Sequence, residues 1–266
     1  MGWKDRLENG FWARLGRHQL GLLLGLSLIA GLLFAFVELA GEVVEGDTLA
    51  FDKALLLAMR DAADPDQPGG PWWLARMARD LTSLGSTTIL TLTTVAALGF
   101  LLLLRKRAAA LLVLVSVGGG MALSSSLKAM IGRARPDLVP HGDLVVTASF
   151  PSGHAMLSAI VYLTIGALLA QFVAGRRVKA YLLVWAMLLT LLIGASRVYL
   201  AVHWPTDVLA GWCIGAAWAA LCWIVAEWLQ RRGAVEQDRG HESAEGDEST
   251  GRARPVLSVK NASSGR

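Results

Sequence analysis

Six stretches of this chain are apolar over the roughly 17 to 25 residues that a helix needs to cross a bilayer. They lie at residues 20–39, 84–104, 108–127, 153–174, 180–196 and 206–230, and the fifth is the shortest. Backbone amide and carbonyl groups inside a bilayer must find partners within the protein, so such segments default to helices. No stretch alternates strongly enough between apolar and polar residues to favour a barrel. The predicted fold is therefore all-α, a polytopic membrane protein with six transmembrane helices.

The composition supports a lipid environment. Hydrophobic residues make up 54% of the chain and charged residues only 17%, against about 25% charged in typical globular proteins. So little charge cannot cover a surface that faces water on all sides, which excludes an ordinary soluble domain. Disorder of the bulk, a collagen repeat and a disulfide scaffold are excluded too. If residues 206–230 form one helix, Cys213 and Cys222 are too far apart along it to bridge.

Basic residues in the short loops predict the orientation. With six spans, all four basic clusters fall on one side of the membrane, and that side should be cytoplasmic. We therefore expect a multi-pass protein of the cytoplasmic (inner) membrane with both termini inside. The clusters are Lys4, Arg6, Arg14 and Arg17; Arg105, Lys106 and Arg107; Arg176, Arg177 and Lys179; and Arg231 and Arg232.

The first outer loop, residues 40–82, is acidic and contains two stretches with helical spacing of apolar residues. We predict short amphipathic helices in the membrane interface, with Trp72 and Trp73 in an aromatic belt. A simple connector and a part in admitting substrate both remain open for this loop. The first stretch carries Phe51, Leu55, Met59 and Ala62, and the second carries Pro71, Leu74, Met77 and Leu81.

Two terminal segments flank the predicted membrane domain of residues 20–232. Residues 1–19 form a cytoplasmic N-terminal segment. Residues 233–266 mix acids and bases with Gly, Ser and Ala and have few large apolar side chains. A segment of this kind cannot form a core, so we expect a disordered cytoplasmic tail.

Polar residues at the edge of a membrane span are costly, and three groups of them fall on the predicted outer face. The first group follows the third span and contains Lys128, Arg133 and Arg135. Guanidinium groups match the oxygens of a phosphate, although a single basic residue at a helix end usually snorkels toward lipid headgroups. Several bases on the outer face run against the positive-inside trend, so we expect them to hold an anion.

The second group, Pro151-Ser152-Gly153-His154, opens the fourth span. Proline suits the first position of a helix, which would leave the amides of Ser152, Gly153 and His154 without helical partners. These amides and the Ser152 hydroxyl form a candidate anion cradle at a helix N-terminus. Such a sequence by itself also fits a plain helix start.

The third group contains Ser196, Arg197, His203 and Asp207. Pro205 places His203 just before the sixth helix and Asp207 in its first turn. The carboxylate can then reach back to one imidazole N–H and leave the other nitrogen as a nucleophile or base. A capping or structural hydrogen bond is the alternative, and no full set of metal ligands is evident nearby.

Taken together, the three groups resemble the signature of the type 2 phosphatidic acid phosphatase superfamily. The matching residues are Lys128-x6-Arg135-Pro136, then Pro151-Ser152-Gly153-His154, then Ser196-Arg197-x5-His203-x3-Asp207. The resemblance is detailed over residues 128–207 and leaves the tail and the outer loop uncovered.

The resemblance implies a role for each motif residue. His203 would attack phosphorus to form a phosphohistidine, Asp207 would orient it, and His154 would protonate the leaving oxygen and then activate water. The phosphate would be bound by Lys128, Arg135, Ser152, Gly153 and Arg197. No metal or other cofactor is expected. Arg133 lies outside the motif, and we expect it to touch a distal phosphate or headgroup.

The resemblance therefore implies a bacterial lipid phosphatase with its site outside the cytoplasm. The expected substrate is a lipid mono- or diphosphate, such as undecaprenyl diphosphate, phosphatidylglycerophosphate or phosphatidic acid; no nucleic acid partner is expected, and the oligomeric state is left open. One alternative is a lipid phosphotransferase, for example one that acts toward lipid A. Another is a transporter that binds headgroups without chemistry, although a transporter has no need of a nucleophile held by a carboxylate.

Overall fold

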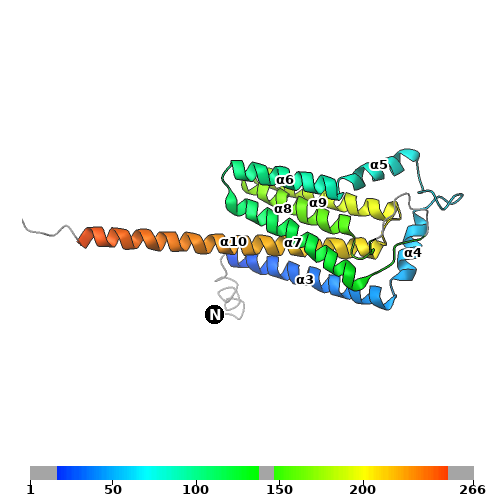
Figure 1. Ribbon diagram of the computed structural model, residues 1–266, viewed down its shortest axis with the longest axis horizontal. Coiled ribbons are helices and arrows are strands. Elements are labelled where there is room, and N and C mark those ends of the chain that lie inside the picture. The colour runs from blue at the N-terminus through cyan, green and yellow to red at the C-terminus, as the bar shows by residue number, and fades with distance from the viewer. Residues whose placement is uncertain (1–16, 138–146, 251–266) are drawn as a thin grey trace, which may run out of the picture. The chain divides into compact units, whose positions relative to one another are not determined.

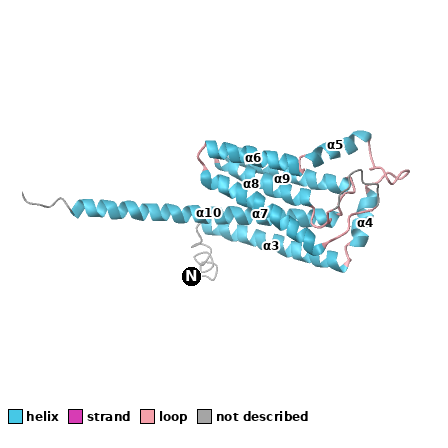
Figure 2. Cartoon of the chain, viewed as in Figure 1, coloured by secondary structure: helices cyan, strands magenta, loops and turns pink. Residues whose placement is uncertain are grey.

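All regular structure in the described part of the chain is helical (Figure 2). The computed structural model describes residues 17–137 and 147–250, and its β-type pairing within them is one isolated bridge between Arg60 and Pro68. The predicted all-α fold is confirmed. In chain order the helices are α3 (Arg17–Glu45), α4 (Leu49–Ala58), α5 (Trp72–Ser83), α6 (Thr87–Leu103), α7 (Arg107–Ile131), α8 (Gly153–Gln171), α9 (Arg176–Tyr199) and α10 (Pro205–Thr250).

Five helices are long and apolar enough to cross a membrane by themselves: α3, α7, α8, α9 and the 205–229 part of α10. The predicted second span corresponds to α6, which has only 17 residues. It follows α5 across a bend of 46°, and the pair forms a sixth candidate span when taken together. The bend occurs where the Ser86 hydroxyl accepts the Ile89 amide at 3.3 Å and so caps a new helix. The fifth span is longer than expected, with 24 residues in α9.

Glycines on α10 bring it close to α8. A Cβ on Gly211 would lie 2.8 Å from the Ser152 carbonyl oxygen, and one on Gly215 would lie 2.6 Å from the Met156 carbonyl oxygen. Small residues four positions apart are a common way for membrane helices to approach one another. This packing sets the start of α8, which carries His154, against the start of α10, which carries Asp207.

The glycine triplet Gly118–Gly120 in α7 permits close packing at two of its three positions. Gly119 faces the ring of Trp218 on α10, and Gly120 faces Ile160 on α8. A Cβ on Gly118 would meet nothing within 4 Å.

The outer-loop helices α4 and α5 lie at the end where α7 and α9 finish and α10 begins (Figure 1). Leu56 of α4 is fully buried and packs in a cluster with Ala155, Val198, Ala201, Trp204 and Val208. The face of α4 that packs on the protein is thus formed by Asp52 and Leu56, while Phe51 of the predicted apolar stripe is 57% exposed. Trp72 and Trp73 at the start of α5 are exposed, as an interfacial position requires.

The C-terminal part of the chain differs from the predicted tail. The chain divides into the units Met1–Ile224 and Val225–Arg266, and α10 continues through the second unit to Thr250. No proline interrupts the sequence between Pro205 and Pro255, and Ala, Glu, Gln and Arg favour helix. Residues 251–266 of the predicted tail and 1–16 of the predicted N-terminal segment lie outside the described residues.

Candidate active site

The three polar groups predicted from the sequence meet at one end of the helices. Hydrogen-bonded pairs there include His203 and Asp207, four positions apart, and Arg197 and Thr82, 115 positions apart. The region is formed by the end of α7, the start of α8, the end of α9, the start of α10 and the loop residues before and after the gap at 138–146 (Figure 1). The basic residues Arg105–Arg107 and Arg176–Lys179 lie at the opposite ends of α7 and α9.

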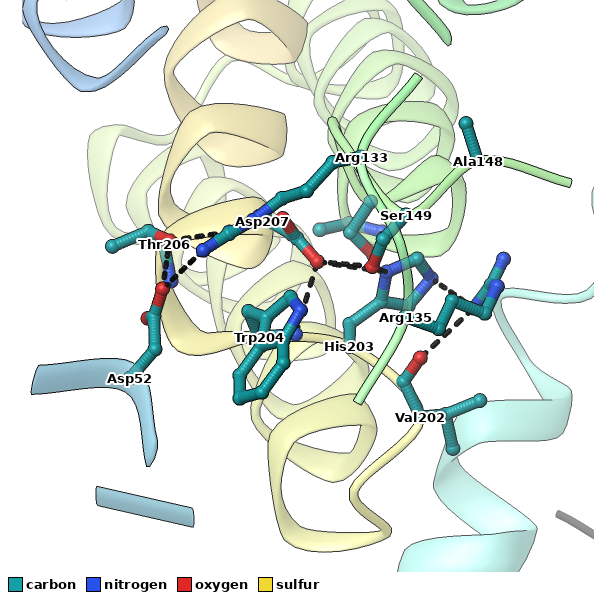
Figure 3. A network of polar contacts seen from close by, with 12 residues as sticks. Asp52, Arg133, Arg135, Ala148, Ser149, Val202, His203, Trp204, Thr206 and Asp207 are labelled. Atoms are coloured by element: carbon teal, nitrogen blue, oxygen red, sulfur yellow. Dashed lines mark hydrogen bonds and ion pairs between the residues drawn. The ribbon is translucent and has the colours of Figure 1, made fainter. Parts of the chain in front are cut away.

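His203 and Asp207 form a buried pair at the start of α10 (Figure 3). The Nδ1 atom of His203 lies 3.4 Å from Oδ2 of Asp207 and 3.2 Å from the Ser149 hydroxyl. The Ser149 hydroxyl donates to the same carboxylate oxygen, which also accepts the Trp204 amide at 3.0 Å. The proton on Nδ1 is therefore shared between two acceptors, and the Nε2 atom keeps its lone pair.

Burial keeps His203 neutral. Loss of water around the ring lowers the pKa of His203 to about 4, although the hydrogen bond with Asp207 and its negative charge act in the opposite direction. Positive charge on Arg135 and Arg197 adds to the lowering. An imidazole with a pKa this low is present as the free base at neutral pH, which is the form that can act as a nucleophile.

Arg135 contacts the other ring nitrogen of His203, Nε2. Its Nη1 atom lies 3.1 Å from Nε2 of His203 and donates to the Val202 carbonyl at 2.9 Å. Two further bonds reach the carbonyl and the hydroxyl of Thr147. Burial lowers the pKa of Arg135 and the charge of Asp207 raises it. An arginine remains charged in a protein, so a planar, positively charged guanidinium group faces His203.

Lys128, Arg197 and His154 surround the same region. The Lys128 ammonium donates to the Ala148 carbonyl at 2.6 Å, and its side chain runs beside Gly153. Arg197 donates to the Thr82 hydroxyl of α5 at 3.0 Å. The positive charges of Arg197 and Arg135 act on both His154 and His203, and that of Lys128 acts on His154. Three cations and two imidazoles are thus within electrostatic range of one another.

The start of α8 differs from the prediction by two residues. Ser152 is the N-cap and Gly153 the first helical residue, so Pro151 precedes the helix instead of opening it. The Ser152 amide donates to the Asp207 carbonyl at 2.9 Å and its buried hydroxyl lies 3.5 Å from the Ala155 amide. Because Ser152 is occupied in this way, the first-turn amides of Gly153 and His154 are the ones placed to meet an anion.

Arg133 is held elsewhere than expected. It was predicted to touch a distal phosphate or headgroup, but its two terminal nitrogens donate to four side chains. Those acceptors are Thr206 at 2.9 Å, Asp207 at 2.7 Å, Thr48 at 3.2 Å and Asp52 at 2.7 Å. Two terminal nitrogens carry four N–H groups, so these bonds use all of them.

Comparison with known proteins agrees with this geometry. The family model of the PAP2 superfamily matches residues 109–231. Phosphatidylglycerophosphatase B of Bacillus subtilis (strain 168) is 36% identical over 149 residues, which is 54% of this chain and 70% of that protein. The chain belongs to the PAP2 superfamily. It is an integral membrane protein and a lipid phosphate hydrolase, as the sequence motifs implied.

Other PAP2 relatives are named for different activities. The undecaprenyl-diphosphatase of Sulfolobus acidocaldarius is 35% identical over 68 residues, 26% of this chain and 29% of that one. The lipid A 1-phosphatase of Rhizobium johnstonii is 34% identical over 113 residues, 39% of this chain and 42% of that one. The crystal structure of a transmembrane PAP2 type phosphatidylglycerolphosphate phosphatase from Bacillus subtilis shares 30% identity and a TM-score of 0.65, covering 75% of this chain and 96% of that one.

Two residues of the PAP2 site were not singled out from the sequence. Ser149 stands two positions before the Pro-Ser-Gly-His motif, where its proximity to that motif was the only signal. Asp52 was counted merely as one of the acids in the outer loop and lies outside the matched range of 109–231. It is fully buried, and the sequence pattern carried no signal for this, because the predicted apolar stripe of α4 ran through Phe51 and Leu55 and left Asp52 among the polar positions.

Within residues 17–137 and 147–250, no group of three or more His, Cys, Asp or Glu side chains is placed to hold a metal ion.

Proposed function

We propose that this PAP2 protein hydrolyses the terminal phosphate of a lipid mono- or diphosphate through a phosphohistidine at His203. Undecaprenyl diphosphate, phosphatidylglycerophosphate and phosphatidic acid are the candidate substrates. The observation that carries the proposal is the placement of a neutral, buried His203 between Asp207 on one side and the guanidinium of Arg135 on the other.

In the first step Nε2 of His203 attacks the phosphorus atom, an N–P bond forms, and the bond from phosphorus to the lipid oxygen breaks. His154 protonates the departing oxygen. The imidazole becomes positively charged as the bond forms, and the Asp207 carboxylate stabilises that charge through Nδ1. Lys128, Arg135, Arg197 and the first-turn amides of α8 neutralise the equatorial oxygens, which is the main work in phosphoryl transfer.

In the second step a water molecule attacks the phosphorus atom and His154 accepts its proton. The N–P bond breaks, the electron pair returns to Nε2, and inorganic phosphate leaves. One group thus acts first as acid and then as base, because the two half-reactions run in opposite directions. The acyl or prenyl chain stays in the bilayer throughout.

We also propose that the site faces away from the cytoplasm, in the cytoplasmic membrane. The basic loops at Arg105–Arg107 and Arg176–Lys179 lie at the helix ends opposite to the site, and such loops are typically cytoplasmic. Both termini are then cytoplasmic as well.

The test is phosphate release by the purified full-length chain against a panel of lipid mono- and diphosphates, with and without EDTA. Wild-type protein should release phosphate in EDTA, and His203→Gln should not; Lys106→Gln, far from the site, is the control. Base-quenched protein should carry radiolabelled phosphate in the wild type and not in His203→Gln, because a phosphohistidine survives base and not acid. Full activity of a folded His203→Gln variant would overturn the proposal, and transfer of label to a second lipid would favour the phosphotransferase alternative.

A further inference from the structure

Arg133 joins two buried carboxylates that come from distant parts of the chain. Its Nη2 atom lies 2.7 Å from Oδ2 of Asp52 on α4, and its Nη1 atom lies 2.7 Å from Oδ1 of Asp207 on α10. Both carboxylates have no exposed side-chain surface, and the arginine side chain is 11% exposed. Figure 3 shows the resulting line of contacts from Asp52 through Arg133 and Asp207 to His203 and Arg135.

The bond from Arg133 determines which oxygen of Asp207 serves the nucleophile. Oδ1 accepts from Arg133, whereas Oδ2 accepts from Ser149, His203 and the Trp204 amide. With Oδ1 held, the carboxylate cannot rotate without losing a charge-assisted hydrogen bond, which is among the stronger bonds in proteins. Arg133 thereby holds Oδ2 toward Nδ1 of His203.

Asp52 in turn determines the position of Arg133. It accepts the backbone amide of Thr206 at 3.0 Å and the Thr206 hydroxyl at 2.6 Å. These contacts cap the first turn of α10 with a carboxylate from another helix, where negative charge is favourable. The guanidinium also lies over the Trp204 ring, 5.5 Å from its centre. Asp52 and Trp204 therefore fix Arg133 at the helix start that carries Asp207.

A network of this kind is expensive to bury. Moving charges out of water costs free energy that attraction within the network only partly offsets, and apolar residues of similar volume often stabilise as well or better. Leu56, one turn after Asp52, already anchors α4 in an apolar cluster. Anchoring of α4 alone thus gives no reason for Asp52, whereas control of Asp207 does.

We infer that Arg133 and Asp52 are positioning residues of the reaction: they act through Asp207 on the nucleophile, so that one side chain of the outer loop, Asp52, contributes to turnover. The inference rests on the proposed roles of His203 and Asp207. Neither residue contacts the phosphate-binding cations Lys128, Arg135 and Arg197 through any bond described above, so substrate binding should not depend on them.

The test compares Asp52→Asn and Arg133→Lys with two controls in purified full-length protein. Leu56→Ala perturbs the packing of α4 without touching a charge, and Asp66→Asn removes an exposed acid from the same loop. Steady-state kinetics on phosphatidic acid, inhibition by vanadate and by inorganic phosphate, and thermal melting are measured for each. Vanadate adopts the geometry of the transition state, and phosphate represents the ground state.

We expect kcat to fall about 10- to 100-fold in Asp52→Asn and Arg133→Lys, the scale that a misplaced catalytic group produces. KM and inhibition by phosphate should stay within about threefold, while inhibition by vanadate weakens in step with kcat. Guanidinium ion added to Arg133→Ala should restore part of kcat. Leu56→Ala should melt at a lower temperature with kcat per folded molecule unchanged, and Asp66→Asn should match the wild type.

Wild-type kcat in either folded variant would overturn the inference. So would an equal loss of kcat in Leu56→Ala at a similar drop in melting temperature, because that would mean that the packing of α4, not its charge, controls turnover. If Asp52→Asn does not fold, Arg133→Lys decides the matter, since it keeps the charge and loses only the fork. Failure of the proposed function would give a different result. Wild-type protein and His203→Gln would then release phosphate at the same rate.

Discussion

The Nη1 atom of Arg135 lies 3.1 Å from Nε2 of His203. In the proposed mechanism this nitrogen attacks phosphorus, and the contact places a cation directly beside it. We expect an incoming phosphate to bind the guanidinium and so to free the lone pair of Nε2. The same contact would thus orient the ring and supply positive charge to the phosphate.

Arg135→Lys should impair both binding and turnover. Lysine keeps the charge but loses the planar fork that reaches Val202, Thr147 and the ring at once. We expect kcat/KM for phosphatidic acid to fall about 100-fold, equivalent to roughly 3 kcal/mol of transition-state stabilisation. Arg76→Gln removes an exposed cation from α5 and is the control. An equal loss in both variants would mean that general positive charge, not this guanidinium, is what matters.

Asp207→Asn should slow turnover far more than it weakens binding. An amide cannot stabilise the positive imidazole as a carboxylate does, and its NH₂ group favours the wrong tautomer of His203. We expect kcat to fall by about 100-fold or more with KM within about threefold, measured by phosphate release. Asp137→Asn, an exposed acid next to the first motif, should behave as the wild type. Parallel loss of affinity and rate would contradict an orienting role for Asp207.

The titration of His203 should lie well below that of an ordinary histidine. In ¹⁵N NMR spectra of the protein, the imidazole signal that is absent from His203→Gln should titrate near pH 4. Because the folded protein holds this proton less tightly than the unfolded chain, stability from His203 is present above pH 6.5 and is lost as the pH falls toward 4. The full effect is about 3 kcal/mol for a shift of this size. A titration midpoint near pH 6.5 would contradict a buried neutral ring. So would a loss of stability between pH 6.5 and 4 that is as large in His203→Gln as in the wild type.

Gly215→Ala should disturb the contact between α8 and α10. Its Cβ would approach the Met156 carbonyl oxygen to 2.6 Å, and overpacking of this kind typically costs about 1 to 3 kcal/mol. We expect a lower melting temperature and reduced activity, since the two helices carry His154 and Asp207. Gly118→Ala meets nothing within 4 Å and should be neutral or slightly stabilising. Equal melting of the two variants would contradict close packing at Gly215.

A topology reporter inserted beside Lys106 should report the cytoplasm. This loop joins α6 to α7 at the end of the helices opposite to the site, and it contains three consecutive basic residues. A second reporter placed after Gly70, between α4 and α5, should report the outside. An exterior signal near Lys106 would reverse the proposed orientation and place the chemistry on the cytoplasmic side.

The helices and the motif residues could be predicted from the sequence, for a physical reason. Apolar runs of spanning length have few structural alternatives in a bilayer, and Pro205 alone is enough to place His203 before a helix and Asp207 inside it. The first residue of a helix was harder to predict. The start of α8 was expected at Pro151 and lies at Gly153, because Ser152 caps the helix and donates its own amide to Asp207.

Arg133 shows where sequence reasoning ends. Its position beside Arg135 suggested a phosphate ligand, but which anion a cation meets depends on what the fold places around it. Its partner Asp52 is 81 residues away in the chain, and Ser149 is 58 residues from Asp207. No local sequence pattern predicts contacts between residues so far apart in the chain.

The amino-acid sequence by itself determined that this protein consists of membrane helices and carries the motifs of the PAP2 superfamily, because hydrophobic length and short-range spacing act within single segments. Only the tertiary structure decided which buried charges face each other. Long-range pairing depends on how α4, α8 and α10 pack together, and that packing brings Asp52 to Arg133 and Arg133 to Asp207.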